Sequence, residues 1–296
     1  MEPRQPEHDF LSRLVAWAER HDLVRALLLT STRASADARV DVLSDFDVIL
    51  YVADTGPFRA RETWLPDLGT VLLGTSLEQG DNHGLPQYWR GVFFDDMTKV
   101  DFTITPAAVL PILREESQLP PGLDLGYRVL IDKDDLTVGL PAPTNTAYLP
   151  PKPTAQEFRA LIEDFWWDTT YVAKYLWRDE IFAARAILDA EIRLQVLRPL
   201  LEWMVEVECG WSIRPGAWGR HFKRYLKAEI WAEVERTFAE ASDEGHWAAL
   251  FQTIAVFRKG AESVAQNLGY EYPRDLDERM TSYLLEIKGL PEKMEG

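Results

Sequence analysis

The chain has 296 residues, 46% of them hydrophobic and 27% charged, which is the composition of an ordinary globular protein long enough for two hydrophobic cores. Its formal net charge of −16 excludes a general nucleic-acid binder, because such proteins need a basic surface. The charge favours neutral or cationic partners, or it serves solubility alone. A single cysteine, Cys209, excludes an internal disulfide and a cysteine metal cluster.

The sequence contains no apolar signal segment near its N-terminus and no run of about 18 apolar residues that could span a membrane. We therefore expect a cytoplasmic protein without membrane contact. We further expect a monomer or a weak homodimer.

The first elements predicted along the chain are a helix and a strand. Residues 8–20 place apolar side chains at helical spacing, and residues 25–30 are typical of a short buried strand. A hydroxyl-rich turn follows, beginning with Ser31, Thr32 and Arg33. Backbone amides and hydroxyl groups in such a turn can bind phosphate oxygens, and an arginine adds positive charge. A plain loop is the other interpretation.

Two aspartates one residue apart, Asp45 and Asp47, precede an apolar run at residues 48–52 that is typical of a buried strand. Residues two apart in a strand point to the same face, so the two carboxylates should lie close together. No basic residue occurs within three positions of either aspartate. Close like charges are unfavourable unless a cation lies between them.

Further strands are predicted at residues 70–73, 88–94 and 99–105, and the last two should form a hairpin. Asp101 interrupts the last strand at a position where an apolar residue is usual. Burying a carboxylate without a partner is costly, so Asp101 should either bind something or face a cavity.

The segment at residues 78–87 is polar, and we expect a loop there. It contains Asp81, Asn82 and His83, which include residue types that bind metals. A single histidine beside an aspartate is also typical of a solvated loop, and both interpretations stay open.

If the strands that carry Asp45, Asp47 and Asp101 are neighbours, their three carboxylates meet at one place. Carboxylates are preferred Mg²⁺ ligands, and one or two such ions can support nucleotidyl transfer to a hydroxyl group. The alternative is that these aspartates cap turns and have only a structural role.

A proline-rich segment at residues 141–153 interrupts regular structure and indicates a domain boundary, which we place between residues 145 and 146. We therefore predict an α+β protein in which domain 1–145 contains a mixed β-sheet flanked by helices and domain 146–296 is an α-helical bundle. The predicted helices are 155–178, 180–208, 219–240, 244–268 and 274–288. Most tryptophans of this half should fill the bundle core, and one or two could line a sugar pocket.

The first long helix of the second half carries charged residues with two interpretations each. Lys174 either pairs with Asp179 or Glu180 or reaches a bound triphosphate. Three acidic residues precede it: Glu163, Asp164 and Asp168. They either form a solvated face or bind the ammonium groups of a polycationic substrate, for which the overall acidity would raise the encounter rate.

The segments STR, SDFDV and KVDFTI occur in an order that resembles the polymerase-β-like nucleotidyltransferases, whose signature is a Gly-Ser turn, an Asp-x-Asp pair and a third strand carboxylate. More narrowly, FFDDMTKVDFTITP, YRVLIDKD, EDFWWDTTYVAKYLWRDEIFAA and WSIRPGAWGRHFKRYL resemble the aminoglycoside 6-adenylyltransferases, which adenylylate streptomycin. The resemblance covers most of the chain, and several segments in the family order are more specific than any one alone.

This resemblance implies an N-terminal nucleotidyltransferase domain of the polymerase-β type and a C-terminal substrate-binding domain. It implies transfer of AMP from ATP to a hydroxyl of an aminoglycoside, with Mg²⁺ as cofactor, and hence antibiotic resistance. The metal would be held by Asp45, Asp47 and Asp101, and Asp101 would also be the base. The ATP phosphates would contact Ser31, Thr32, Arg33 and Lys174. The aminoglycoside would contact Glu163, Asp164 and Asp168.

The chain departs from the family pattern at Ser31, where the family has glycine. Glycine suits a position where the backbone approaches a ligand or takes a positive φ, and a Cβ makes either less favourable. Two other functions stay open. One is a nucleotidyltransferase that modifies a lincosamide or another small metabolite, and the other is a catalytically weak nucleotide-binding module.

Overall fold

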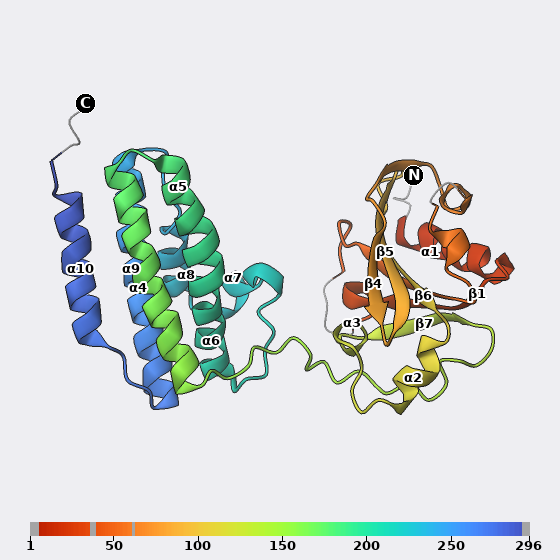
Figure 1. Cartoon of the computed structure of the whole chain (residues 1–296). Helices are drawn as coiled ribbons and strands as arrows, with labels where there is room; N and C mark the ends of the chain where they lie inside the picture. Colours follow the sequence, from red (N-terminus) through yellow and green to blue (C-terminus); the bar gives the residue numbers. More distant parts are fainter. Residues whose placement is uncertain (1–5, 36–39, 61–62, 292–296) are drawn as a thin grey trace. The chain divides into compact units, whose positions relative to one another are not determined.

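The computed structural model describes residues 6–35, 40–60 and 63–291 of the chain. It divides into two compact units, Met1–Tyr148 and Leu149–Gly296, which are drawn together in Figure 1 and described separately below. The first unit contains a mixed β-sheet and the second is helical, so the predicted α+β class is confirmed. No helix among the described residues is both long enough and apolar enough to cross a bilayer.

The first unit is built on a sheet in the order β3-β5-β6-β2-β1-β7, with β4 paired to β5 outside this path. Only the central β2–β6 pair is parallel among the pairs described, and the others are antiparallel. The strands are β1 (Val24–Thr30), β2 (Phe46–Val52), β3 (Val71–Gly74), β4 (Glu78–Asn82), β5 (Leu85–Phe94), β6 (Lys99–Pro106) and β7 (Tyr127–Asp132).

Helices pack on both faces of this sheet. The helices and short 3₁₀ turns are α1 (Pro6–Arg20), η1 (Ser31–Arg33), η2 (Gly56–Phe58), η4 (Leu65–Asp67), α2 (Val109–Glu115) and α3 (Pro121–Asp124). Successive side chains of a strand point to opposite faces, and β1 follows this rule. Leu27 and Leu29 join the core beneath α1, whereas Ala26 and Leu28 join the core beneath α2. The central strand β1 is therefore buried on both faces.

Most predicted strands of the first unit are confirmed, including the hairpin of β5 and β6. The loop predicted at residues 78–87 is wrong, because β4 lies there and pairs with β5. Its side chains are largely exposed, so it lacks the apolar alternation that identifies a strand. His83 and Gly84 connect the two strands with φ of 57° and 78°, values that suit a two-residue hairpin turn.

The proline-rich segment is attached to the first unit by a fully buried aspartate, Asp124. Its carboxylate accepts hydrogen bonds from the backbone N–H groups of Thr144, Thr146 and Ala147 at 2.7–2.9 Å. These bonds satisfy the extended backbone of a segment whose prolines prevent regular structure. They explain why the first unit continues as far as Tyr148.

The second unit consists of helices, of which α4, α6 and α9 lie side by side in Figure 1. The elements are α4 (Ala155–Trp177), α5 (Ile181–Arg185), the π-helix η5 (Ala186–Leu197), α6 (Arg198–Cys209), η6 (Ala217–Gly219), α7 (Phe222–Tyr225), α8 (Ala228–Glu235), α9 (Asp243–Leu268) and α10 (Arg274–Lys288). The predictions for α4, α9 and α10 are confirmed. The single helix predicted at 219–240 is wrong, because the extended backbone at Leu226 separates α7 from α8.

Aromatic side chains fill much of this helical core. Trp166 and Trp247 are buried, and the rings of Phe165 and Phe257 stack with their centroids 3.6 Å apart. Trp167 is the exception on α4, with 66% of its surface exposed. The prediction that tryptophans mainly serve packing therefore holds for the inward face of α4, and Trp167 lies on its solvent face.

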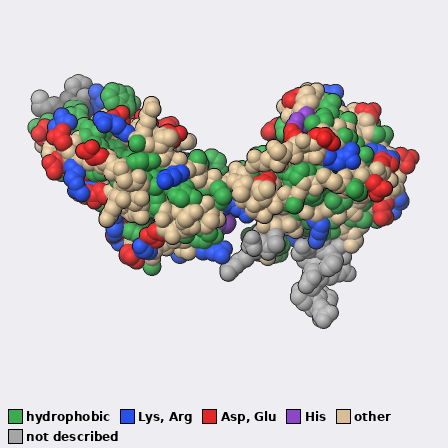
Figure 2. All heavy atoms as spheres, turned by 90° about the horizontal axis from the view of Figure 1, so that it is seen from below, with side chains coloured by type: hydrophobic (Ala, Val, Ile, Leu, Met, Phe, Trp, Pro, Cys, Tyr) green, Lys and Arg blue, Asp and Glu red, His purple; other side chains and the backbone are tan. Residues whose placement is uncertain are grey.

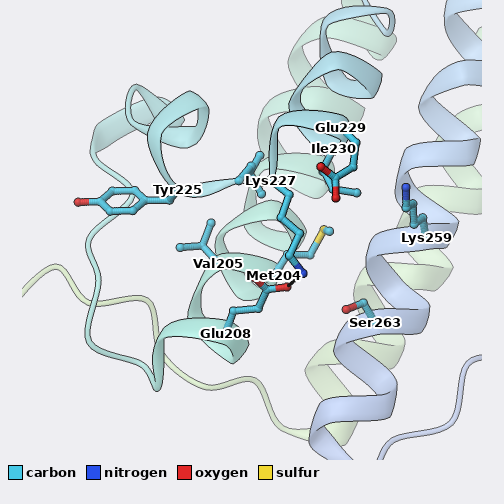
Figure 3. A pocket seen from close by; sticks show the side chains of 10 residues that line it. Met204, Val205, Glu208, Tyr225, Lys227, Glu229, Ile230, Lys259 and Ser263 are labelled. Atoms are coloured by element: carbon cyan, nitrogen blue, oxygen red, sulfur yellow. Dashed lines mark hydrogen bonds and ion pairs between the residues drawn. The ribbon is translucent and has the colours of Figure 1, made fainter.

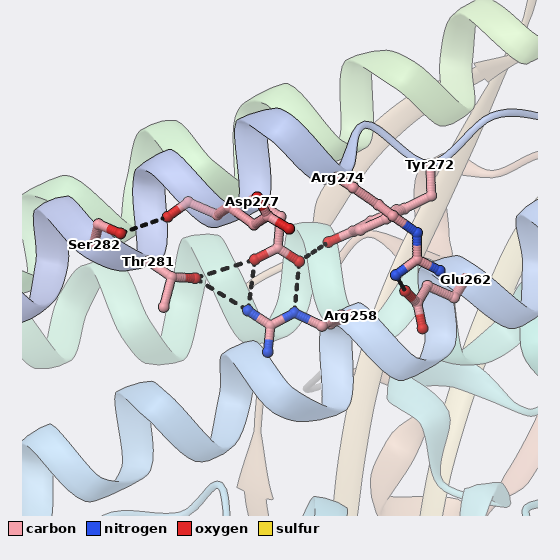
Figure 4. Close-up of polar contacts among 8 residues, drawn as sticks. Arg258, Glu262, Tyr272, Arg274, Asp277, Thr281 and Ser282 are labelled. Atoms are coloured by element: carbon pink, nitrogen blue, oxygen red, sulfur yellow. Dashed lines mark hydrogen bonds and ion pairs between the residues drawn. The ribbon is translucent and has the colours of Figure 1, made fainter.

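A hydrogen-bonded ion pair joins α9 to α10 (Figure 4). The guanidinium of Arg258 donates to both carboxylate oxygens of the buried Asp277 at 2.5 Å. The hydroxyls of Tyr272 and Thr281 also donate to this carboxylate, at 2.7 and 3.0 Å. Burial alone would raise the pKa of Asp277, but the bonds from Arg258 and Tyr272 outweigh it, and the pKa lies below its usual value. The negative charge of Asp277 is therefore balanced by Arg258 and by the two hydroxyl donors.

Candidate functional site

The parallel pairing of β2 with β6 brings the three predicted aspartates together at one end of the sheet. In its register Asp47 lies opposite Asp101, and Phe46 lies opposite Val100. Asp45 immediately precedes β2, and its negative charge acts on Asp47. The carboxylates thus come together from two neighbouring strands and the residue before one of them, which is the arrangement that the sequence analysis made conditional on strand pairing.

A lysine that the sequence analysis missed lies among these carboxylates. The ammonium of Lys99 contacts Asp45 Oδ2 at 2.5 Å and Asp101 Oδ2 at 3.3 Å. The hydrogen bond to Asp45 raises the pKa of Lys99, so its positive charge is held firmly. The signal was present in the sequence, because Lys99 precedes Asp101 by two residues on the same strand and therefore shares its face.

Asp47 is the least compensated of the three carboxylates. Burial raises its pKa, and the negative charges of Asp101 and Asp45 raise it further. A hydrogen bond from the Ser31 side chain and the charge of Lys99 act in the opposite direction without cancelling the shift. The site therefore holds more negative charge than its own residues neutralise.

Ser31 occupies a strained backbone position at the end of β1. Its φ is 59°, in the left-handed region that favours glycine, and the N–H groups of Ala34 and Ser35 donate to its carbonyl at 3.0 Å. This geometry agrees with the expectation that a residue with a Cβ is unfavourable at position 31. The Ser31 hydroxyl bonds to Asp47, a contact that glycine cannot make.

Arg33 fastens this turn to the segment that leads into β2. Its Nη2 donates to the carbonyl of Ser44 at 2.7 Å, and its Nε donates to the carbonyl of Asp45 at 3.0 Å. Its guanidinium also lies over the ring of Phe46, 4.0 Å from the centroid. Arg33 thereby positions the backbone of Asp45. This structural role does not depend on any contact between Arg33 and a nucleotide. Thr32 lies beside it in η1 and is partly exposed.

Gly91 on β5 leaves room beside Asp101. The two residues are paired across β5 and β6, and a Cβ at Gly91 would lie 3.0 Å from Asp101 Oδ1. Thr75 secures this glycine, since its Oγ1 accepts a hydrogen bond from the Gly91 N–H at 2.9 Å. The space beside the Asp101 carboxylate therefore depends on the presence of glycine at position 91 of β5.

The donor set fits a hard divalent cation in type, because Mg²⁺ prefers carboxylate oxygens. Within the described residues, however, no three His, Cys, Asp or Glu side chains are already gathered as a metal site. Lys99 holds Asp45 and Asp101 instead. The metal interpretation of residues 78–87 gains no support, since His83 faces Glu116 at 3.4 Å.

In the helical unit, Lys174 lies over two aromatic rings of its own helix. Its ammonium is 4.3 Å from the centroid of Tyr171 and 4.9 Å from that of Tyr175. These cation–π contacts hold a partly exposed lysine on the α4 surface. They replace the pairing with Asp179 or Glu180 that the sequence left open, and its contact with a triphosphate stays a prediction.

The three acidic residues predicted to bind substrate differ in their surroundings. Glu163 is exposed and accepts a hydrogen bond from Arg159 at 2.9 Å, a local pair one turn apart. For Asp168, burial raises the pKa, and the negative charges of Glu191 and Asp164 raise it further. Glu191, on the π-helix η5, was not predicted; it is distant in sequence, and only the packing of η5 on α4 brings it near.

A hollow of about 190 Å³ lies among α6, α8 and α9 of the helical unit (Figure 3). Its lining residues are Met204, Val205, Glu208, Tyr225, Leu226, Lys227, Glu229, Ile230, Lys259 and Ser263. Lys227 extends to Glu208 at 2.6 Å. The hollow is smaller than the roughly 300–1,000 Å³ of typical ligand pockets and contains none of the predicted site residues. We assign it no function.

Charged side chains are interspersed on the surface. On the face of each unit seen in Figure 2, acidic, basic and hydrophobic side chains alternate, and neither sign of charge forms a continuous patch. The net charge of −16 is therefore not concentrated on that face. On that face, contact with a charged substrate would therefore depend on local groups of charged side chains and not on the net charge of the protein.

Comparison with known proteins identifies the family. A family model described as streptomycin adenylyltransferase matches residues 4–287. The chain belongs to the streptomycin adenylyltransferase family. It is thus a nucleotidyltransferase, as the resemblance of its motifs implied.

Members of the family with curated names cover nearly the whole chain. The aminoglycoside 6-adenylyltransferase of Bacillus subtilis (strain 168) is 29% identical over 282 residues, which are 94% of this chain and 96% of the relative. That of Campylobacter jejuni is 28% identical over 286 residues, covering 95% and 96%. A solved structure of an aminoglycoside 6-adenyltransferase from Bacillus subtilis matches 96% of this chain and 99% of its own, with 24% identity and a TM-score of 0.45.

Proposed function

We propose that this protein transfers AMP from ATP to a hydroxyl group of an aminoglycoside, with streptomycin as the acceptor, and releases pyrophosphate. The observation that carries the proposal is the register of β2 and β6, which aligns Asp47 with Asp101, together with Lys99, which contacts both Asp45 and Asp101. Family membership and the names of the relatives support the reaction class. The product would be an inactivated antibiotic.

In the proposed mechanism, the carboxylates of Asp45, Asp47 and Asp101 would hold Mg²⁺. The bound ion would neutralise charge on the ATP phosphates and orient the α-phosphate for in-line attack. Asp101 accepts the proton of the acceptor hydroxyl. The hydroxyl oxygen then forms a bond to the α-phosphorus, and the bond from that phosphorus to the bridging oxygen breaks, so that pyrophosphate departs.

Four residues are proposed to hold the nucleotide: Ser31, Thr32, Arg33 and Lys174. The hydroxyl of Thr32 can donate to a phosphate oxygen, because η1 leaves it partly exposed beside the aspartates. The proposed role of Lys174 rests on family resemblance. Because ATP is the co-substrate, we also propose that the protein acts in the cytoplasm, as a monomer or a weak homodimer.

We propose that the aminoglycoside is recognised through its ammonium groups by acidic residues of α4. Asp164 and Asp168 support this role best, because Asp168 lies among like charges without a described basic partner. An ammonium group bound there would relieve that repulsion. Glu163 is the weakest of the three, since Arg159 already occupies its carboxylate.

Mass spectrometry of streptomycin after incubation with the protein, ATP and Mg²⁺ tests the proposal directly. A mass gain of one adenylyl group, together with pyrophosphate release, is the expected result. Pyrophosphate release with a lincosamide but not with any aminoglycoside would overturn the acceptor and keep the reaction. Absence of nucleotidyl transfer to every compound of an aminoglycoside and lincosamide panel would overturn the proposed function.

A further inference from the structure

The carboxylate site already contains a cation of its own. Lys99 lies two residues before Asp101 on β6, and its ammonium bridges Asp101 and Asp45 of the neighbouring chain segment. Lysine and its two partners are each about 40% exposed, so this group lies at the open end of the sheet and not in the core. The side chain can leave the site without creating a buried cavity.

The ammonium and a divalent ion compete for the same carboxylate oxygens. Lys99 Nζ lies 2.5 Å from Asp45 Oδ2 and 3.3 Å from Asp101 Oδ2, and Mg²⁺ binds carboxylate oxygen at about 2.1 Å. An ion on either of these oxygens would lie close to the ammonium, and two cations at such a distance repel each other strongly. An ion that binds through these two oxygens therefore has to displace the ammonium.

We propose that Lys99 is an exchangeable counter-ion of the aspartate site, which stabilises the metal-free protein and is displaced when a divalent cation binds. This inference rests on the metal site of the proposed function. Displacement opposes metal binding, so Lys99 lowers the affinity of the nucleotide-free protein for the ion. The metal would then bind best together with ATP, whose phosphates supply further oxygen ligands.

Lys99→Met tests the exchange, because methionine is similar in length and lacks the charge. We expect it to bind Mn²⁺ about tenfold more tightly than the wild type in the absence of nucleotide, since two partly exposed ion pairs no longer compete with the metal. Free Mn²⁺ is measured by electron paramagnetic resonance, which does not depend on catalysis. Lys99→Arg keeps the charge and should leave the affinity within about threefold of the wild type.

Arg13→Met is the matched control. Arg13 is exposed to the same extent as Lys99, 43%, and forms an equivalent surface ion pair with Asp96 at 2.6 Å in the same unit. The Arg13→Met substitution removes one positive charge and leaves Lys99 and the three aspartates unchanged. Mn²⁺ affinity should therefore stay within about twofold of the wild type, as expected for a solvent-screened surface charge that contacts none of the three aspartates.

Thermal unfolding gives a second measurement. Metal-free Lys99→Met should unfold at a lower temperature than the wild type, because repulsion among the carboxylates is no longer balanced. Saturating Mn²⁺ should raise its unfolding temperature by more than it raises that of the wild type. A variant that gains no more from Mn²⁺ than the wild type would contradict the exchange.

The failure of this inference is distinguishable from failure of the proposed function. Equal or weaker Mn²⁺ binding by Lys99→Met, with binding abolished in Asp47→Asn, overturns the exchange and keeps the metal site. Unchanged binding in Asp47→Asn shows that the ion lies elsewhere, which overturns both the exchange and the metal assignment. The mass-spectrometric assay with streptomycin separately decides the reaction.

Discussion

Two aspartate sites in this molecule have opposite electrostatic character. In the helical unit, Asp277 receives two bonds from Arg258 and one each from Tyr272 and Thr281, and its pKa is lowered. At the end of the sheet, Asp47 lies near two other carboxylates, and burial and their charges raise its pKa. The same residue type is thus fully paired in one place and under-compensated in the other.

The difference separates structural carboxylates from those for which we propose a function. A carboxylate that holds a fold together gains from complete pairing, because leaving a buried charge unpaired costs free energy. A carboxylate that must bind an exchangeable cation cannot be permanently neutralised by its own protein. The pairing state of an aspartate therefore predicts which property its replacement will damage.

Asp47→Asn should have the largest effect of these substitutions. It should lower the catalytic activity without lowering the stability. We expect the rate of adenylyl transfer to fall by at least about a thousandfold, because a proposed metal ligand is lost. Stability in the metal-free state should stay the same or rise, since the change removes a charge that Asp45 and Asp101 disfavour. Transfer rates and urea unfolding measure the two quantities.

Asp96→Asn is the control for this change, since Asp96 pairs with Arg13 at the surface and accepts a bond from the Thr98 N–H, which asparagine can still accept. It should leave both rate and stability nearly unchanged. Substantial turnover by Asp47→Asn would contradict its catalytic assignment.

Asp277→Asn should have the opposite consequence, with stability lowered and catalytic activity retained. Loss of the charged partner of Arg258 is expected to lower the free energy of unfolding of the helical unit by about 2–3 kcal/mol, as for hydrogen bonds to a charged group. The specific activity of the folded protein at low temperature should be retained. A fall in activity without a fall in stability, measured by urea unfolding and transfer assays, would contradict the comparison.

Acid should remove the contribution of Asp277. Its pKa is lower in the folded than in the unfolded protein, so its stabilising effect is complete above the usual aspartate pKa of about 3.9 and is lost as the pH falls from there through the folded value. The stability gap between wild type and Asp277→Asn should therefore be constant near neutral pH and close below about pH 4. Urea unfolding across this pH range checks the sign, and a gap that widens in acid would refute it.

Asp168→Asn extends the comparison to the proposed substrate surface. Asp168 lies among like charges, whereas Glu163 is paired with Arg159. We expect Asp168→Asn to raise the KM for streptomycin about tenfold, as for loss of one charged contact, and Glu163→Gln to change it by about twofold. Steady-state kinetics at saturating ATP measure both. Equal effects would show that pairing in the free protein does not predict substrate contact.

The smallest effect is expected at Ser31. With φ at 59°, glycine relieves backbone strain at this position, whereas alanine keeps the strain and loses the hydroxyl bond to Asp47. Ser31→Ala should therefore be less stable than Ser31→Gly by about 1 kcal/mol. Urea unfolding of the two variants measures the difference, and an alanine variant at least as stable as the glycine variant would exclude the left-handed conformation.

Much of the fold was predictable from local patterns. Apolar spacing identified α4, α9 and α10, and the run after Asp47 identified β2, because these signals depend only on neighbouring residues. The exposed strand β4 gave no such signal and was predicted as a loop. The break between α7 and α8 was also missed, since helical periodicity continues across it.

The candidate site shows the same division between local and distant information. Asp45 and Asp47 are two residues apart, as are Lys99 and Asp101, and the sequence alone determined both spacings. That β2 and β6 are adjacent, parallel and aligned with Asp47 opposite Asp101 was decided only by the tertiary structure. Strand pairing joins segments about fifty residues apart, so no local pattern encodes its register. The contact of Lys99 with Asp45, which lies 54 residues away in the sequence, was likewise decided by the tertiary structure.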